Sequence, residues 1–219
     1  MSERTALLEP QFDRLEQQRE ASSIGMWAFL ASEILFFGTL FAGYAVYRTL
    51  FPEAFHEGSR MLVWPAGAVN TAVLLTSSLT MALAVRATRT GSRSGALLFL
   101  LATVFFGAVF LGIKGWEYAD EFHKGHVPVG LGSLFGWAGT EGPDAPRTDL
   151  FLTFYFIMTG FHALHMVVGL GLMLWMAWTV LRSPIERAAG PVEMTGLYWH
   201  FVDVVWIFLF PMLYLLGLD

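Results

Sequence analysis

The side chains of this sequence that could carry chemistry are acids and histidines set inside long apolar stretches. In the stretch from Thr195 to Gly217, His200 and Asp203 lie three residues apart, so in a helix they share one face. A charged group in hydrocarbon is costly, at about 2.5 kcal/mol or more for an aspartate on insertion scales. We therefore expect partners for both side chains, either from this chain or from another protein.

Two other apolar stretches contribute similar side chains. Glu33 lies in the first stretch, and His162 and His165 lie three apart in the fourth. With a rise of about 1.5 Å per residue, Glu33 and Asp203 fall at one depth, and the histidines fall close to it. The sequence thus predicts a structural or proton-linked intramembrane cluster of Glu33, His162, His165, His200 and Asp203.

Each member of this cluster has a structural and a functional interpretation. Glu33 is either a protonated, hydrogen-bonded carboxyl or a proton-handling group. His162 and His165 are either hydrogen-bonding core residues facing the fifth helix or ligands of a metal or haem. His200 and Asp203 are expected to form an imidazole–carboxylate pair that bridges helices. Bis-histidine haem ligation and proton-coupled transport remain alternatives, although the spacing and the lack of similar halves fit them poorly.

Two further polar residues and five tryptophans have simpler interpretations. Asn70 is expected to make an interhelical hydrogen bond. Glu117 is expected to be a solvated acid at the outer end of a helix. The tryptophans near predicted helix ends are expected to anchor the membrane interfaces: Trp27, Trp64, Trp116, Trp178 and Trp199.

Composition places these residues in a membrane protein. The 219 residues are 55% hydrophobic and only 14% charged, which is far from a soluble domain. The net charge is −5 and no basic run is present, so nucleic acid is excluded as a partner. The absence of cysteine removes thiolate zinc, iron–sulfur and thiolate copper sites. We expect no catalytic, cofactor-binding or metal site in this chain.

Hydropathy predicts an all-α integral membrane protein with a bundle of five transmembrane helices. Each apolar stretch is close to or above the roughly 20 residues that span hydrocarbon. The polar segment 1–23 precedes the bundle of residues 24–218, and residues 114–149 form an external loop. The predicted helices are 24–47, 63–85, 95–113, 150–181 and 194–218.

Lysines and arginines are divided unequally between the two sides of this bundle. The N-terminal side holds eight and the other side holds five. The positive-inside rule therefore predicts a cytoplasmic N-terminus and a C-terminus on the outer, periplasmic side. The eight are Arg4, Arg14, Arg19, Arg86, Arg89, Arg93, Arg182 and Arg187, and the five are Arg48, Arg60, Lys114, Lys124 and Arg147.

Four segments carry a resemblance to one known family. YWHFVDVVWIFLF (198–210) looks like the signature of subunit III of haem–copper terminal oxidases, and MTGFHALHMVVG (158–169) resembles another helix of that family. GMWAFLASEILFFGTLFAGYAVY (25–47) resembles its glutamate-bearing helix, and VNTAVLLTSS (69–78) matches a fourth segment. The motifs occur in the family's order, and the chain is similar to its five-helix bacterial form.

The resemblance implies an accessory subunit of a proton-pumping respiratory oxidase that reduces oxygen to water in the bacterial inner membrane. Such subunits carry no redox centre, stabilise the catalytic subunit I, bind phospholipid and support proton uptake, while haem and copper lie in partner subunits. Glu33 falls at the family's carbodiimide-reactive carboxyl. The five-helix form lacks two helices of the longer members, which form one wall of their lipid cleft, and it occurs with cytochrome c and quinol oxidases. The residues alone leave one alternative, a stand-alone haem-binding or proton-handling membrane protein.

Overall fold

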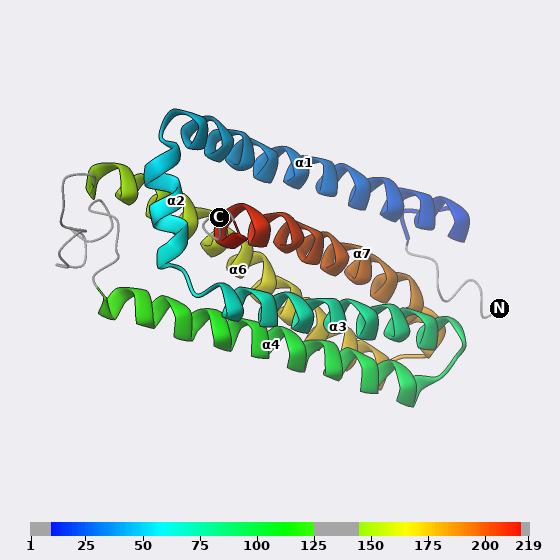
Figure 1. The fold of residues 1–219 in the computed structure, drawn as a ribbon. Coiled ribbons are helices and arrows are strands. Elements are labelled where there is room, and N and C mark those ends of the chain that lie inside the picture. Colours follow the sequence, from blue (N-terminus) through cyan, green and yellow to red (C-terminus); the bar gives the residue numbers. More distant parts are fainter. Residues whose placement is uncertain (1–9, 125–144, 216–219) are drawn as a thin grey trace.

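The chain folds into long helices that lie side by side, with one short helix across an end of the bundle (Figure 1). The computed structural model describes residues 10–124 and 145–215, and this part contains no strand. In chain order the helices are α1 (Leu15–Leu50), α2 (Pro52–Met61), α3 (Trp64–Arg89), α4 (Arg93–His123), α6 (Ala145–Arg182) and α7 (Ile185–Phe210), and α7 continues as a π-helical turn at Pro211–Leu215.

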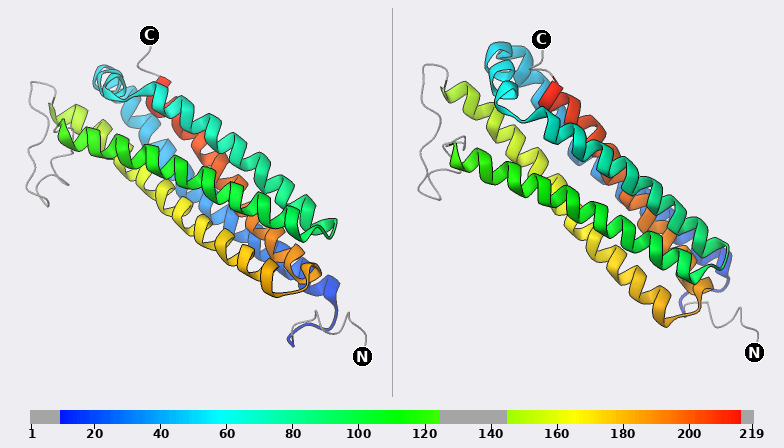
Figure 2. Two further views of the ribbon diagram at one scale, coloured as in Figure 1. Left: turned by 90° about the horizontal axis from the view of Figure 1, so that it is seen from below. Right: turned by 60° about the horizontal axis from the view of Figure 1, so that its bottom comes forward.

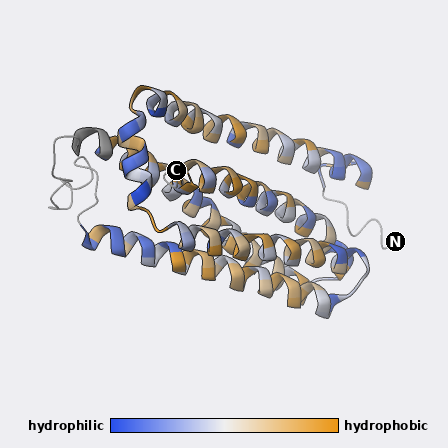
Figure 3. Cartoon of the chain, viewed as in Figure 1, coloured by the Kyte–Doolittle hydropathy of each residue, from blue (hydrophilic) through white to orange (hydrophobic). Residues whose placement is uncertain are grey.

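Five of the described helices, all but α2, are long and apolar enough to cross a membrane. This confirms the predicted all-helical class and the count of five spans. Figure 3 shows apolar residues along these helices, with hydrophilic residues on α2 and near the start of α1 and the end of α4.

The helices extend further than the apolar stretches that predicted them. α1 begins at Leu15, within the segment predicted as a polar extension. α4 continues to His123 and α6 begins at Ala145, so the described ends of the predicted external loop are helical. Hydropathy marks where apolar residues stop, whereas a helix continues while its backbone hydrogen bonds and caps hold. The last predicted helical residues, 216–218, lie outside the described part.

Four helices form a closed ring of neighbours. α3 packs against α4, α4 against α6, α6 against α7, and α7 against α3. α1 lies outside this ring and packs against α7 and α6 (Figures 1 and 2). The outward face of α7 therefore lies between α3 and α1.

The indole of Trp199 occupies the centre of this ring. Trp199 is fully buried, and its Nε1 donates a hydrogen bond to Ser77 Oγ at 3.0 Å. Gly107 and Gly169 make room for the ring, since a Cβ added at either residue would lie 2.8 to 2.9 Å from an indole carbon. The prediction that Trp199 anchors an interface is wrong, because its side chain is a central core element.

The end of α7 is tied to two other helices through its backbone. Pro211 has no N–H to continue the α-helical pattern, and the chain forms the π-helical turn there. Tyr44 of α1 donates its hydroxyl to Met212 O at 2.6 Å, and Ser59 of α2 donates to Leu213 O at 2.6 Å. The widened turn thus presents two carbonyls that fasten α1 and α2 to α7.

Candidate functional site

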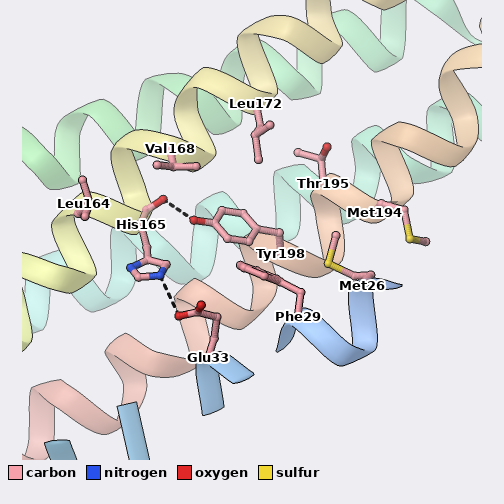
Figure 4. A pocket seen from close by; sticks show the side chains of 10 residues that line it. All are labelled: Met26, Phe29, Glu33, Leu164, His165, Val168, Leu172, Met194, Thr195 and Tyr198. Atoms are coloured by element: carbon pink, nitrogen blue, oxygen red, sulfur yellow. Dashed lines mark hydrogen bonds and ion pairs between the residues drawn. The ribbon is translucent and has the colours of Figure 1, made fainter. Parts of the chain in front are cut away.

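Glu33 of α1 and His165 of α6 form a direct pair near the middle of their helices. His165 Nε2 lies 3.1 Å from Glu33 Oε2, and His165 Nδ1 lies 2.8 Å from the carbonyl of Phe161. Tyr198 of α7 donates its hydroxyl to His165 O at 2.9 Å (Figure 4). Three helices therefore fix the pair, which is the one contact within the predicted cluster that joins two helices in the described part.

The hydrogen bonds of His165 determine how many protons the pair holds. A carbonyl oxygen only accepts, so Nδ1 must carry the proton shared with Phe161 O. Nε2 and Glu33 Oε2 then share a single further proton, either as a carboxylic acid donating to a neutral ring or as an imidazolium donating to a carboxylate. The pair is neutral overall in both forms, which suits side chains that are only 19% and 16% exposed in an apolar surrounding.

A cleft of about 430 Å³ opens beside this pair. α1, α6 and α7 all contribute to its lining, which is apolar apart from the pair, Thr195 and the Tyr198 hydroxyl (Figure 4). A cleft of this shape and chemistry suits an apolar chain rather than a charged ligand. The remaining lining residues are Met26, Phe29, Leu164, Val168, Leu172 and Met194.

His200 and Asp203 form a second group, which is centred on α3 and α7. Ser78 Oγ of α3 lies 2.8 Å from His200 Nδ1, while Asp203 Oδ2 lies 3.9 Å from the same nitrogen. The helix-to-helix bridge is therefore made by Ser78 and His200, and not by the predicted imidazole–carboxylate pair, whose two members lie on one helix. Neither carboxyl oxygen of Asp203 has a hydrogen-bond partner in the described part.

His162 lies apart from both groups, in the core. Its ring packs between Phe110 of α4 and Trp206 of α7, at centroid distances of 5.5 and 5.2 Å. It does face the fifth span, as predicted, yet neither ring nitrogen has a hydrogen-bond partner among the described residues. Asn70 is likewise buried without a partner there, so the interhelical hydrogen bond predicted for it is not found.

Sequence reasoning missed a buried ionic cluster at the end of α4. Lys114 Nζ lies 2.9 Å from Glu117 Oε2, 3.1 Å from the Tyr155 hydroxyl and 2.8 Å from the Tyr214 hydroxyl. Tyr214 donates to Glu117 Oε1 at 2.6 Å. The Lys114 side chain is 5% exposed and that of Glu117 is 0% exposed. The prediction that Glu117 is solvated is therefore wrong.

The ammonium of Lys114 is also surrounded by aromatic faces. Nζ lies 4.8 to 5.5 Å from the centroids of four rings, a geometry in which ring quadrupoles attract a cation. The four rings belong to Tyr118, Tyr155, Trp206 and Tyr214. The sequence offers one signal of this buried cluster. Lys114 and Glu117 lie three residues apart beside an apolar stretch, and Tyr118 follows them.

The polar residues thus form separate groups rather than a ligand set. Within the described residues, no group of three or more histidine, cysteine or acidic side chains is placed to hold a metal ion. Glu33 and His165 bind each other, His200 binds Ser78, and His162 is enclosed by aromatic rings. This arrangement can hold one proton shared between Glu33 and His165.

Comparisons with known proteins agree with these features. The family model described as cytochrome c oxidase subunit III matches residues 146–218. Quinol oxidase subunit 3 of Bacillus spizizenii is 30% identical over 216 residues, 93% of each chain. Cytochrome c oxidase subunit 3 of Thermostichus vulcanus is 32% identical over 207 residues, 93% of this chain and 92% of the relative. A cytochrome bo(3) ubiquinol oxidase subunit 3 from Pseudomonas putida is 32% identical over 195 residues, 89% of this chain and 85% of the relative. A likeness of this extent, over nearly the whole of both chains, shows that the chain belongs to the cytochrome c oxidase subunit III family.

Proposed function

We propose that this chain is the accessory subunit III of a proton-pumping haem–copper respiratory oxidase that reduces oxygen to water. One observation carries the proposal: relatives named as oxidase subunit 3 align with 93% of the chain at about 30% identity. Five apolar helices and bacterial relatives support a multi-pass protein of the bacterial inner membrane.

In this proposal the chain itself is not catalytic and carries no redox centre. The surroundings of His162 and His165, the two histidines considered as metal or haem ligands, support this, because a haem ligand needs a ring nitrogen aimed at open space. His165 uses both nitrogens within the chain, and His162 is enclosed by Phe110 and Trp206. Haem and copper then belong to the partner subunits, with catalytic subunit I as the principal partner.

The N-terminus is proposed to lie in the cytoplasm and the C-terminus on the periplasmic side. The structure alters the charge count that supports this orientation. Lys114 belongs to the buried cluster of α4 and is not an external loop cation, so the outer side loses one of its five basic residues. The difference that the positive-inside rule uses becomes larger.

The cleft beside Glu33 and His165 supports the roles in lipid binding and proton uptake. Its apolar lining suits the acyl chain of a phospholipid, and the shared proton can move between Glu33 and His165 at its wall without a change in the net charge of the pair. Relatives named as quinol oxidase and as cytochrome c oxidase subunits align almost equally well.

Purification of the tagged chain from its native membrane tests this function. In mild detergent we expect haem-bearing subunits to co-purify in a fixed ratio, and we expect the chain separated from them to show no Soret band. A stoichiometric Soret band on the separated chain would favour the stand-alone haem protein. Recovery of the chain without any haem-bearing subunit would contradict the accessory role.

A further inference from the structure

One face of α7 is turned away from the bundle and carries a polar side chain. We name it the α7 strip, and it consists of Leu197, His200, Val204 and Phe208. Spacings of three and four residues place these side chains on one helix face. Val204 is 47% exposed and Phe208 is 55% exposed, and the His200 side chain is 37% exposed. The strip lies between α3 and α1, which pack on either side of α7 (Figure 1).

His200 lies six residues after Met194, where the apolar stretch of this span begins, so its imidazole reaches the surface about 9 Å inside that stretch and within the hydrocarbon. Lipid tails offer no hydrogen-bonding group there. Polar side chains at this depth face the interior of a bundle or a partner. An outward imidazole on a lone helix face is therefore incompletely satisfied.

The chain satisfies only the inner nitrogen of this ring. Nδ1 lies 2.8 Å from Ser78 Oγ, whereas Nε2 has no hydrogen-bond partner among the described residues. Other outward hydroxyls of the spans behave differently, since Ser32, Thr39 and Thr76 each donate to a carbonyl of their own helix. His200 is thus the one of these outward groups that the chain leaves incomplete.

We propose that the α7 strip binds a transmembrane helix of a neighbouring oxidase subunit, which presents a hydrogen-bonding group to His200 Nε2 within the membrane. This inference rests on the proposed function, since the occupant is another subunit of the complex. The occupant has an apolar surface that packs on Val204 and Phe208 and one hydroxyl, amide or carbonyl oxygen level with His200. Ser78 holds the ring so that Nε2 points outward.

The outward face of α4 provides a matched control surface. Leu98, Leu101 and Phe105 are as exposed as the α7 strip, with Leu101 at 52%, but this set carries no polar group. A photoreactive phenylalanine analogue is placed at Val204 in one variant and at Leu101 in another. In native membranes we expect Val204 to cross-link to a haem-bearing subunit and Leu101 to cross-link mainly to lipid. Cross-links from Leu101 to that subunit with none from Val204, or a Val204 link only to lipid or to a second copy of this chain, would overturn the inference.

Substitution of His200 tests the hydrogen bond itself. Interhelical hydrogen bonds in membranes are worth about 0.6 to 1.7 kcal/mol, so His200→Leu is expected to reduce co-purified haem about three- to twentyfold. His200→Gln, which keeps a donor and an acceptor, should restore part of the loss, and Thr76→Val should have no effect. In the separated chain, His200→Leu and Ser78→Ala each remove the hydrogen bond between Ser78 and His200, so both variants should lower the melting temperature by the same amount.

Two results would reject the role of His200 in binding: full retention of haem by His200→Leu, or a melting temperature of the separated His200→Leu chain far below that of Ser78→Ala. Either would leave the proposed function intact, because the wild-type chain still co-purifies with haem. If no haem-bearing subunit co-purifies with the wild-type chain, the proposed function is rejected instead. The two failures are therefore distinguishable in one set of purifications.

Discussion

The buried pair of Lys114 and Glu117 gives a sharp test of how this bundle is stabilised. Replacing Glu117 by leucine removes the carboxylate that accepts from Lys114 Nζ at 2.9 Å and from the Tyr214 hydroxyl at 2.6 Å. The ammonium keeps the hydroxyls of Tyr155 and Tyr214 and four ring faces, yet none of these carries a compensating charge. Glu117→Leu therefore leaves a buried cation without its hydrogen-bonded counterion, and Glu121 remains as the acid near it.

Removing one partner of a buried pair typically destabilises a protein by about 3 to 5 kcal/mol. The remaining hydroxyls and rings place Glu117→Leu near the lower end, at about 3 kcal/mol. At roughly 2 to 4 °C per kcal/mol for a chain of this size, the melting temperature should fall by about 6 to 12 °C. The exposed pair of Arg89 and Glu193 supplies the control, because Glu193→Ala should change stability by about 0 to 1 kcal/mol.

The assay is thermal unfolding of the separated chain in detergent, followed by tryptophan fluorescence and helical circular dichroism. The double variant Lys114→Met with Glu117→Leu removes both charges and should recover most of the lost stability, since apolar replacement of a buried ion pair is often neutral. A Glu117→Leu chain as stable as Glu193→Ala, or a double variant less stable than Glu117→Leu alone, would refute the argument from charge burial.

Three further changes test other parts of the structure. Glu33→Gln keeps a donor for His165 Nε2 but has no exchangeable carboxyl proton, so the oxidase spectrum should stay intact while activity is lost faster during turnover; unchanged inactivation kinetics would contradict this. Gly169→Ala places a Cβ against the Trp199 ring and should lower the free energy of unfolding by about 1 to 3 kcal/mol in the same melting assay. Asp203→Ala removes the carboxyl group that lies 3.9 Å from His200 Nδ1 on the same helix, and it should weaken retention of the chain in the purified complex. A complex that survives detergent as well as wild type would show that this carboxyl group is dispensable.

The sequence was sufficient to predict the five spans and the similar depth of Glu33 and the histidines of the fourth span. The length of an apolar stretch is enough to predict a membrane-spanning helix, because in lipid a single segment satisfies its backbone hydrogen bonds only as a helix. Depth arithmetic placed Glu33 and the histidines of the fourth span near one level, and the structure joins Glu33 to His165. Depth does not give rotation about the helix axis, however. His162 lies only three residues from His165 and yet points into the core.

The ends of the helices show a second limit of sequence reasoning. A lysine and an acid after an apolar stretch are typical of a solvated loop, and Lys114 and Glu117 were interpreted in that way. They are buried because they neutralise each other and because Tyr155 and Tyr214, distant in the chain, complete their hydrogen bonds. Trp199 shows the same limit, since its central position depends on glycines in two other helices.

The hydrogen bonds at the π-helical turn bear on the order in which the chain can assemble. α7 closes the ring of α3, α4 and α6 and supplies the carbonyls of Met212 and Leu213 that hold Tyr44 and Ser59. It also leaves the ribosome after helices α1 to α6. During synthesis α1 must therefore stay in the membrane without α7, the helix on which it mainly packs, and the bundle gains its full set of contacts when this turn is inserted.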